Sequence, residues 1–496
     1  MPSGFSPQDF AYLAPELVLT AGALLLLIGD VLTPRGRERW LYWLAGGVVA
    51  GTGAALATTA GADVTAAGGL MSVDDFGVFF KVVFLLSAAM TVLMSPRYLD
   101  VEGARVGEYL FLVLCATLGM FFMASGIDLV TIFVGLETMA IAFYVLVGYI
   151  KPNRRSNEAA IKYFLLGTFS LGILLYGMSM LYGLTGTTQL RAIAGALSSA
   201  TPGPLLPLAV ILVAAGVGFK IAAVPFHMWA PDVYEGAPTP ITAFLSVGSK
   251  AASFAMLLRI FLEGLPQFRF EGLSVVDGTP VGWTTIFYGL AVVTMTVGNL
   301  AAITQSNMKR LLAYSSIAHA GYLLIGVVAG SARGVTAMLI YLFVYLFMQL
   351  GAFAIVVMLR RQDVIGDELK DMSGLYSRNP AAAVAMLIFM LSLGGIPPTA
   401  GFMGKFWLFS AAIESGFVWL AVIGVLNSAI SLYYYVRVIV FMWVKEETIG
   451  SPVTLAPALG LVVGVALVGT VVFGVYPAPL FELAEASART LGVAVF

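Results

Sequence analysis

A few ionisable side chains lie inside long apolar stretches of this sequence. Glu137 is in the middle of TIFVGLETMAIAFYVLVGY, and Lys220, Lys250 and Lys405 lie in three later apolar stretches. Ionisable groups at membrane depth cost several kcal/mol, so they are functional candidates by default. One acid and three bases in such surroundings predict a relay that accepts, holds and passes on protons.

The simplest interpretation pairs Glu137 with Lys220, since burial would drive each alone toward its neutral form. A carboxylate close to the lysine would hold it charged, and a carboxylate that moves away would favour release of the proton. Lys250 would then be the next carrier and Lys405 the exit group. The alternative is a purely structural ion pair between Glu137 and Lys220.

Three more residues are possible members of the relay. His319 could pass protons between Lys250 and Lys405, because imidazole titrates near neutral pH; a histidine satisfied between packed helices is the alternative. Lys162 could relay protons or anchor its helix at the membrane surface. His227 could relay protons or cap a helix break.

The composition indicates a membrane protein. Of 496 residues, 60% are hydrophobic and 11% charged, against about 45–50% and about 25% in soluble domains. A helix needs about 20 apolar residues to cross a hydrocarbon core of roughly 30 Å. Enough such stretches occur to predict an all-α polytopic membrane protein with about 14 transmembrane helices. They lie near 10–33, 40–60, 74–94, 108–124, 127–150, 157–184, 205–226, 239–262, 282–303, 308–330, 333–360, 379–414, 416–444 and 453–476.

The basic residues between these stretches predict an orientation. Fifteen fall in loops on one side, and five on the other: Arg191, Arg259, Arg269, Arg333 and Arg489. Cytoplasmic loops carry the excess of lysine and arginine. Both termini are therefore predicted on the non-cytoplasmic side of the membrane.

Two of the predicted spans contain prolines that should break the helix. Pro225 follows Lys220 by five residues, and Pro397-Pro398 precedes Lys405 by seven. Each proline removes a helical hydrogen bond, and broken backbone at membrane depth is tolerated only where protein or water satisfies it. Paired breaks of this kind are the best sequence pointer to an ion site.

The two broken spans, the seventh and the twelfth, are five spans apart. A unit of five helices begins and ends on opposite faces, so its next copy must be inverted. We therefore expect a single transmembrane domain with two inverted five-helix repeats, spans 4–8 and 9–13. Its parts are the first three helices at 1–94, the repeats at 108–262 and 282–444, and a last helix with its tail at 453–496.

Two further patterns predict structure rather than chemistry. The glycine pairs Gly47/Gly51 and Gly460/Gly464 have the spacing of closely packed membrane helices. The segment HMWAPDVYEGAPTP is typical of a rigid turn rich in proline and glycine.

Several classes of function are excluded by what the chain lacks. One cysteine, Cys115, and two histidines are too few for an iron–sulfur cluster, a structural zinc site and most other redox centres. A net charge of −1 makes nucleic acid a poor partner and leaves the lipid bilayer as the expected environment. No Walker motif is present, so ATP hydrolysis is not expected.

The string GFKIAAVPFHMWAPDVYEGAPTPITAFLSVGSKAA at 218–252 resembles the proton-translocating, antiporter-like subunits of respiratory complex I and their multisubunit cation/proton antiporter relatives. Four other stretches are similar to the family of N subunits of bacterial NADH-quinone oxidoreductases. They are SNEAAIKYFLLG, QSNMKRLLAYSSIAHAGYLL, MLSLGGIPPTAGFMGKFWLFSAAI and GVLNSAISLYYYVRV.

This resemblance implies that Glu137, Lys220, Lys250 and Lys405 are the family's proton-handling residues at the membrane centre. It implies a membrane-arm subunit of an NADH:quinone oxidoreductase that moves protons from the cytoplasm to the outside. Redox chemistry on other subunits would drive it, and flavin, iron–sulfur clusters and quinone would be bound there. The partners would be other membrane-arm subunits, including further antiporter-like ones.

Three alternatives remain at this point. The chain could belong to a multisubunit Na⁺/H⁺ antiporter, to a related complex fed by ferredoxin, or to the arm as a structural linker. A path rich in lysine disfavours a sodium site, since such a site needs oxygen ligands.

Overall fold

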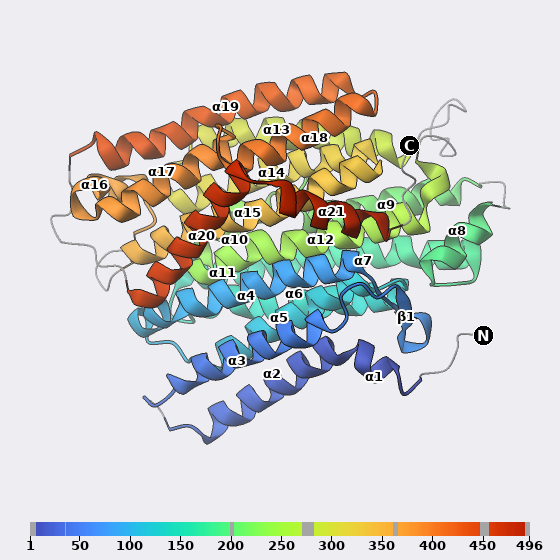
Figure 1. Cartoon of the computed structure of the whole chain (residues 1–496), viewed down its shortest axis with the longest axis horizontal. Helices are drawn as coiled ribbons and strands as arrows, with labels where there is room; N and C mark the ends of the chain where they lie inside the picture. Colours follow the sequence, from blue (N-terminus) through green and yellow to red (C-terminus); the bar gives the residue numbers. More distant parts are fainter. Residues whose placement is uncertain are drawn as a thin grey trace.

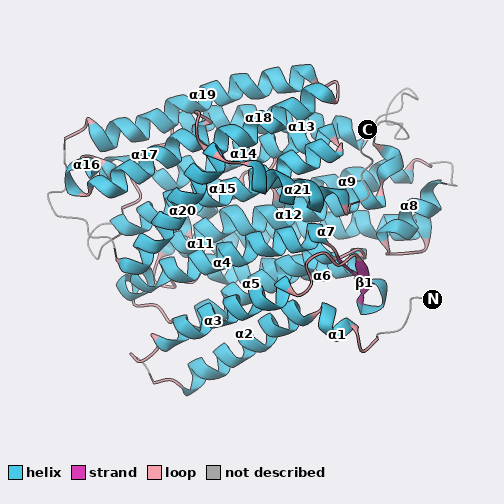
Figure 2. Ribbon diagram, viewed as in Figure 1, coloured by secondary structure: helices cyan, strands magenta, loops and turns pink. Residues whose placement is uncertain are grey.

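The computed structural model describes residues 6–34, 36–198, 203–269, 282–360, 366–446 and 456–491. It is almost entirely helical (Figure 2), so the predicted all-α class is confirmed. In this part of the chain, 12 helices are long and apolar enough to cross a membrane. They are α2 (Ala14–Leu32), α3 (Trp40–Ala57), α4 (Asp75–Glu102), α5 (Gly107–Ser125), α6 (Leu129–Val147), α7 (Arg154–Thr185), the continuous segment Thr239–Gly264, α13 (Trp283–Ile303), α14 (Met308–Ala329), α15 (Ala332–Leu359), α19 (Val418–Trp443) and α20 (Pro457–Val475).

Both spans that contain the predicted breaks consist of two helices. The first has α9 (Leu205–Lys220) and α10 (Trp229–Gly236), with Pro225 between them. The second has α17 (Pro380–Gly394) and α18 (Ala400–Glu414), separated by Pro397 and Pro398. All three prolines are exposed, while Lys220 and Lys405 are buried. Each break therefore lies at the lateral surface of the molecule, and the lysine beside it points inward.

The segment Thr239–Gly264 is irregular in a way that its sequence does not indicate. Helix α11 (Thr239–Phe244) passes into a π-helical turn at Leu245–Ser249, and α12 (Lys250–Leu258) follows directly. A second π-helical turn covers Arg259–Gly264. Single π turns inside α-helices are rare and occur often at functional sites. Lys250 is the first residue after one.

Short elements complete the described chain. The sequence did not predict the small antiparallel hairpin in which Val64 pairs with Val73. The short elements are α1 (Asp9–Tyr12), β1 (Val64–Ala66), β2 (Met71–Val73), α8 (Leu190–Ser198), α16 (Leu375–Arg378), α21 (Ala478–Arg489) and the 3₁₀ turns Ala67–Gly69, Pro266–Phe268 and Leu369–Met372. Of the predicted C-terminal segment, residues 453–455 and 492–496 lie outside the described residues.

Polar side chains fix where several helices begin. Each accepts a hydrogen bond from a backbone N–H of the first turn, which has no partner inside the helix. The residues that do so are Asp74, Asp128, Asn153, Asn307, Ser331 and Asn379. These caps set where α4, α6, α7, α14, α15 and α17 begin.

The helices nearest the lysines form the centre of the molecule. The segment Thr239–Gly264, α14 and α15 are buried along almost their whole length. Figure 1 places α14 and α15 in the middle, with α2 and α3 along one edge and α19 along the other. The edge helices expose many large apolar side chains, as expected of surfaces that face lipid or another membrane subunit.

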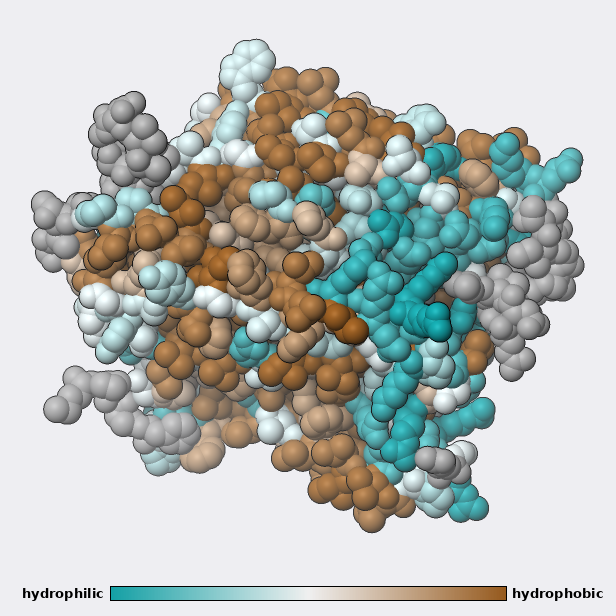
Figure 3. Space-filling model, turned by 180° about the vertical axis from the view of Figure 1, so that it is seen from behind, coloured by the Kyte–Doolittle hydropathy of each residue, from teal (hydrophilic) through white to brown (hydrophobic). Residues whose placement is uncertain are grey.

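The helices run roughly parallel, so the molecule has two ends. Helix α1, the hairpin, α8 and the end of α21 lie at one end in Figure 1, and α16 lies at the other. Figure 3, seen from behind, shows a mostly hydrophobic face on which the most hydrophilic residues gather toward the α16 end. The first and last described helices are therefore at the same end.

Arg259 corrects the loop assignment on which the predicted orientation partly depended. It lies within the span Thr239–Gly264 and is fully buried. Its Nη2 contacts both carboxylate oxygens of Asp74 at 2.8 and 2.7 Å, and its Nη1 lies 2.5 Å from Glu263. Two acidic partners allow a guanidinium to stay inside the protein, so Arg259 is not a loop residue.

The glycine pairs expected to pack helices closely do not all do so. Gly47 and Gly464 have no atom within 4 Å of the position that a Cβ would take. The close approach is instead between α5 and α6. A Cβ on Gly119 would lie 2.4 Å from the amide nitrogen of Met139 and 2.6 Å from the carbonyl of Gly135.

Candidate proton-transfer site

Lys220 is the last residue of α9 and has an exposed fraction of only 3%. In the described part of the chain its Nζ has no hydrogen-bond partner, so the predicted direct pair with Glu137 is not formed in this structure. The charge of Glu137 still acts on Lys220. The ammonium instead lies over three aromatic rings, 5.7 Å from the centroid of Tyr144 and 5.9 Å from the centroids of Tyr163 and Phe219.

Glu137 occupies the middle of α6 but is only half-buried. Val134 and Ile141, one turn before and after it on the same face, are more than half exposed. The carboxylate thus lies between the lateral surface and the interior. This position explains why it does not reach Lys220 directly.

Aromatic side chains form a box around Lys220 that the sequence analysis missed. Tyr144 and Tyr163 meet edge to face at 4.9 Å, and Tyr163 stacks on Trp229 at 4.7 Å. Trp229 donates a hydrogen bond of 3.0 Å to the carbonyl of Phe219, beside the lysine. The hydroxyls of Tyr144 and Tyr163 are buried without hydrogen-bond partners. The box therefore brings three unpaired polar groups into one place.

Lys250 contacts the second half of the chain. Its Nζ donates to the backbone carbonyl of Ser316 on α14 and to the hydroxyl of the same residue, at 2.5 Å for the hydroxyl. That hydroxyl also lies 3.3 Å from the hydroxyl of Tyr234 on α10. The ring of Tyr345 on α15 lies 5.8 Å from Nζ. Lys250 is thus held between the two predicted repeats.

His319 lies one turn after Ser316 on α14, and the charges of Lys250 and Lys405 both act on it. Its Nε2 is 3.0 Å from the hydroxyl of Tyr435, and its Nδ1 contacts the hydroxyl of Tyr341. The ring is fully enclosed by these partners and is placed between the two lysines.

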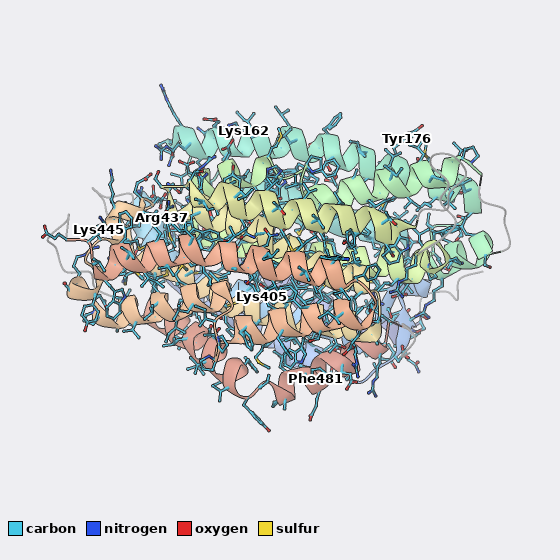
Figure 4. All side chains as sticks on the ribbon, turned by 90° about the horizontal axis from the view of Figure 1, so that it is seen from above. Lys162, Tyr176, Lys405, Arg437, Lys445 and Phe481 are labelled. Atoms are coloured by element: carbon cyan, nitrogen blue, oxygen red, sulfur yellow. The ribbon has the colours of Figure 1, made fainter. Side chains whose placement is uncertain are left out.

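Lys405 lies on α18, about midway along the helices in Figure 4. Its Nζ donates hydrogen bonds to the carbonyls of Leu393 and Gly394, at 3.0 and 3.1 Å, and to the hydroxyl of Ser428 at 2.9 Å. The ring of Tyr322 lies 4.8 Å from it. The hydroxyl of Tyr322 in turn accepts a hydrogen bond from Asn299.

Lys162 lies apart from the buried path, toward the edge of the bundle in Figure 4. Its side chain is 42% exposed and pairs with Glu158 and with Asp232, both at 2.7 Å. Asp232 also pairs with Arg310 at 2.7 Å. The predicted turn around Asp232 is wrong: this residue belongs to helix α10, because Pro231 falls in the first turn, where its missing N–H is not needed.

His227 lies in the break between α9 and α10 and is half-buried. Its Nδ1 is buried without a hydrogen-bond partner. The structure does not bring it into contact with the lysines of the path.

Among the described residues, two of the buried ion pairs that lie outside the path involve α4 and its N-cap residue. Arg259 and Asp74 form one of them; burial alone would raise the pKa of Asp74, but the charge of Arg259 and hydrogen bonds from Ser72 and Gly77 lower it. In the other, Lys81 on α4 lies 2.6 Å from Glu16 on α2. Across the described ranges, no group of three or more histidine, cysteine or acidic residues could hold a metal ion.

The comparisons with known proteins agree with this geometry. A family model described as "NADH:quinone oxidoreductase/Mrp antiporter, TM" matches residues 126–431. NADH-quinone oxidoreductase subunit N 2 of Solibacter usitatus is 44% identical over 493 residues, which is 97% of this chain and 98% of that protein. Subunit N of Trichlorobacter lovleyi is 45% identical over 492 residues, with 98% of each chain covered.

Among solved structures, a chain of respiratory complex I from Thermus thermophilus with bound aureothin is 34% identical, with a TM-score of 0.78 over 95% of this chain and 99% of that one. The chain therefore belongs to the subunit N family of NADH-quinone oxidoreductases, and it is a multi-pass membrane subunit of respiratory complex I.

More distant structures share the fold alone. A chain of the archaeal membrane-bound sulfane sulfur reductase is 23% identical with a TM-score of 0.85, and a chain of the Mrp complex from Dietzia is 21% identical with a TM-score of 0.83. In both cases 98% of each chain is covered.

Proposed function

We propose that this subunit moves protons from the cytoplasm to the outside through Lys220, Lys250 and Lys405 in that order. Glu137 controls the charge of Lys220, and His319 passes protons between Lys250 and Lys405. Redox chemistry on other subunits of the complex, where flavin, iron–sulfur clusters and quinone are bound, supplies the driving energy.

One observation carries this proposal: the three lysines are buried, and a polar residue of α14 binds one of them. Ser316 binds Lys250, and His319 follows one turn later within range of Lys405. Serine, histidine and tyrosine can each donate and accept hydrogen bonds, as a proton path requires. Neighbouring antiporter-like subunits would complete the surroundings of the half-buried Glu137.

We further propose fourteen membrane crossings, in which α9–α10 and α17–α18 form two broken crossings beside the twelve long helices. The repeats would cover 108–262 and 282–444, between 1–94 and 453–496. An even number of crossings fits the placement of α1 and α21 at one end of the molecule, which we assign to the non-cytoplasmic side of the bacterial plasma membrane.

The test is Lys220→Ala in the assembled complex, reconstituted into vesicles. We expect the number of protons moved per NADH oxidised to fall well below the wild-type value, because the path loses its first carrier. Lys151→Ala, which alters an exposed lysine, is the control and should match wild type. Unchanged proton movement in the Lys220 variant would refute the proposed path.

A further inference from the structure

Two prolines leave two backbone carbonyls without helical partners at the end of α17. In a regular helix, the carbonyls of Leu393 and Gly394 would accept hydrogen bonds from the N–H groups of residues 397 and 398. Both of those residues are proline and have no N–H. The preceding carbonyls, of Leu391 and Ser392, are satisfied by the backbone N–H groups of Ile396 and Gly395.

The ammonium of Lys405 binds both of these free carbonyls. It also binds the hydroxyl of Ser428, which itself donates to the carbonyl of Gly394 at 3.1 Å. The face of Tyr322 lies 4.8 Å away, where an aromatic ring attracts a cation. Three oxygens and a ring thus surround one positive charge.

This site has the features of a cation site at a helix C-terminus. The last carbonyls of a helix carry a partial negative charge, and carbonyls of broken membrane helices coordinate cations in transporters. Gly395 leaves the room that the lysine needs. It has a φ of +83°, and a Cβ there would lie 3.0 Å from Cδ of Lys405.

The other two lysines of the path lack such a site. Among the described residues, Lys220 has no hydrogen-bond acceptor, and Lys250 binds only the two oxygens of Ser316. The three lysines therefore lie in three different environments. Only Lys405 is bound by oxygens from two helices, α17 and α19.

We propose that the end of α17, together with Ser428, is a binding site for a monovalent cation that the side chain of Lys405 occupies, as an ammonium while it carries a proton and as an amine after it has passed the proton on. The lysine is a tethered cation, and it keeps Na⁺ out of a site whose oxygens would accept it. Lys405 is thus the residue that restricts this route to protons. This inference rests on the proposed function, since selectivity matters only in a chain that moves protons.

The test measures binding rather than transport, so it can fail independently of the proposed function. Purified complex with Lys405→Ala is incubated with radioactive sodium at equilibrium. We expect saturable, stoichiometric Na⁺ binding above the wild-type level. Lys220→Ala is the matched control: it also removes a buried lysine, but no oxygen among the described residues accepts a hydrogen bond from that lysine, so no additional binding is expected.

A second variant locates the site. Adding Ser428→Ala to the Lys405 variant removes one of the three oxygens and should weaken Na⁺ binding. Should Lys405→Ala fail to assemble, Lys405→Ser carries the same expectation. Binding no greater than in the Lys220 variant, or binding that Ser428→Ala leaves unchanged, overturns the inference even where proton movement is lost.

Discussion

The buried lysines of this subunit differ in what their ammonium groups contact, and so in the motion each needs to pass on a proton. In the described part of the chain, Lys220 has no hydrogen bond to break, whereas Lys250 must leave Ser316. Their presence inside membrane-spanning stretches could be predicted, because a charge inside an apolar stretch stands out, and all three are buried. Their contacts could not, because Ser316 lies 66 residues from Lys250 and a tyrosine in an apolar stretch, such as Tyr163, is typical of ordinary core.

Asp74→Asn should destabilise the protein strongly. It leaves the buried guanidinium of Arg259 with one acidic partner fewer, and breaking a buried pair costs about 3–5 kcal/mol of the free energy of unfolding. The measurement is the thermal unfolding of the purified complex. Glu108→Gln, which breaks the exposed pair with Arg105, is the control and should have little effect.

The same variant has an expected pH dependence. The pKa of Asp74 is lower in the folded protein than in the unfolded chain, so its stabilising effect is complete above about pH 4 and is lost as the pH falls through the folded-state value. The difference between wild type and Asp74→Asn should therefore be constant between about pH 5 and 8. A difference that shrinks within this window would contradict the assignment.

At the scale of elements, the prolines predicted both helix breaks, and their missing N–H groups explain the ligands of Lys405. The π-helical turn before Lys250 could not be predicted, since no residue in Leu245–Ser249 distinguishes it from an ordinary helix. Nor could the sequence predict that Arg259 is buried inside a span, because its acidic partner Asp74 comes 185 residues earlier. Local patterns indicate where a helix ends, and only the fold shows which distant residue satisfies a buried charge.

Gly119→Ala should force α5 and α6 apart. Its added Cβ would lie 2.4 Å from the amide nitrogen of Met139, a contact that a rigid backbone cannot relieve. We expect the free energy of unfolding to fall by about 1–3 kcal/mol, as it does at other overpacked positions. Gly47→Ala, in helix α3 with open space around it, is the matched control and should be neutral or slightly stabilising. Equal melting temperatures of the two variants would contradict the close crossing.

At the scale of the whole molecule, the proposed orientation can be tested with single cysteines, because Cys115 is the only native one. With Cys115→Ser as background, Lys151→Cys should react with a membrane-impermeant maleimide from the cytoplasmic side. Ala192→Cys should react only from the opposite side. Both positions are exposed. The reverse pattern would refute the topology derived from the basic residues.

The contact between Lys250 and Ser316 has a consequence for how the chain is made. A ribosome delivers the helices in order, so Lys250 enters the membrane well before the residue that supplies both of its acceptors. Until α14 has been inserted, the ammonium group of Lys250 lacks the two oxygens of Ser316 that bind it in the folded subunit. The earlier half of the chain therefore matures only after translation of the later half has begun.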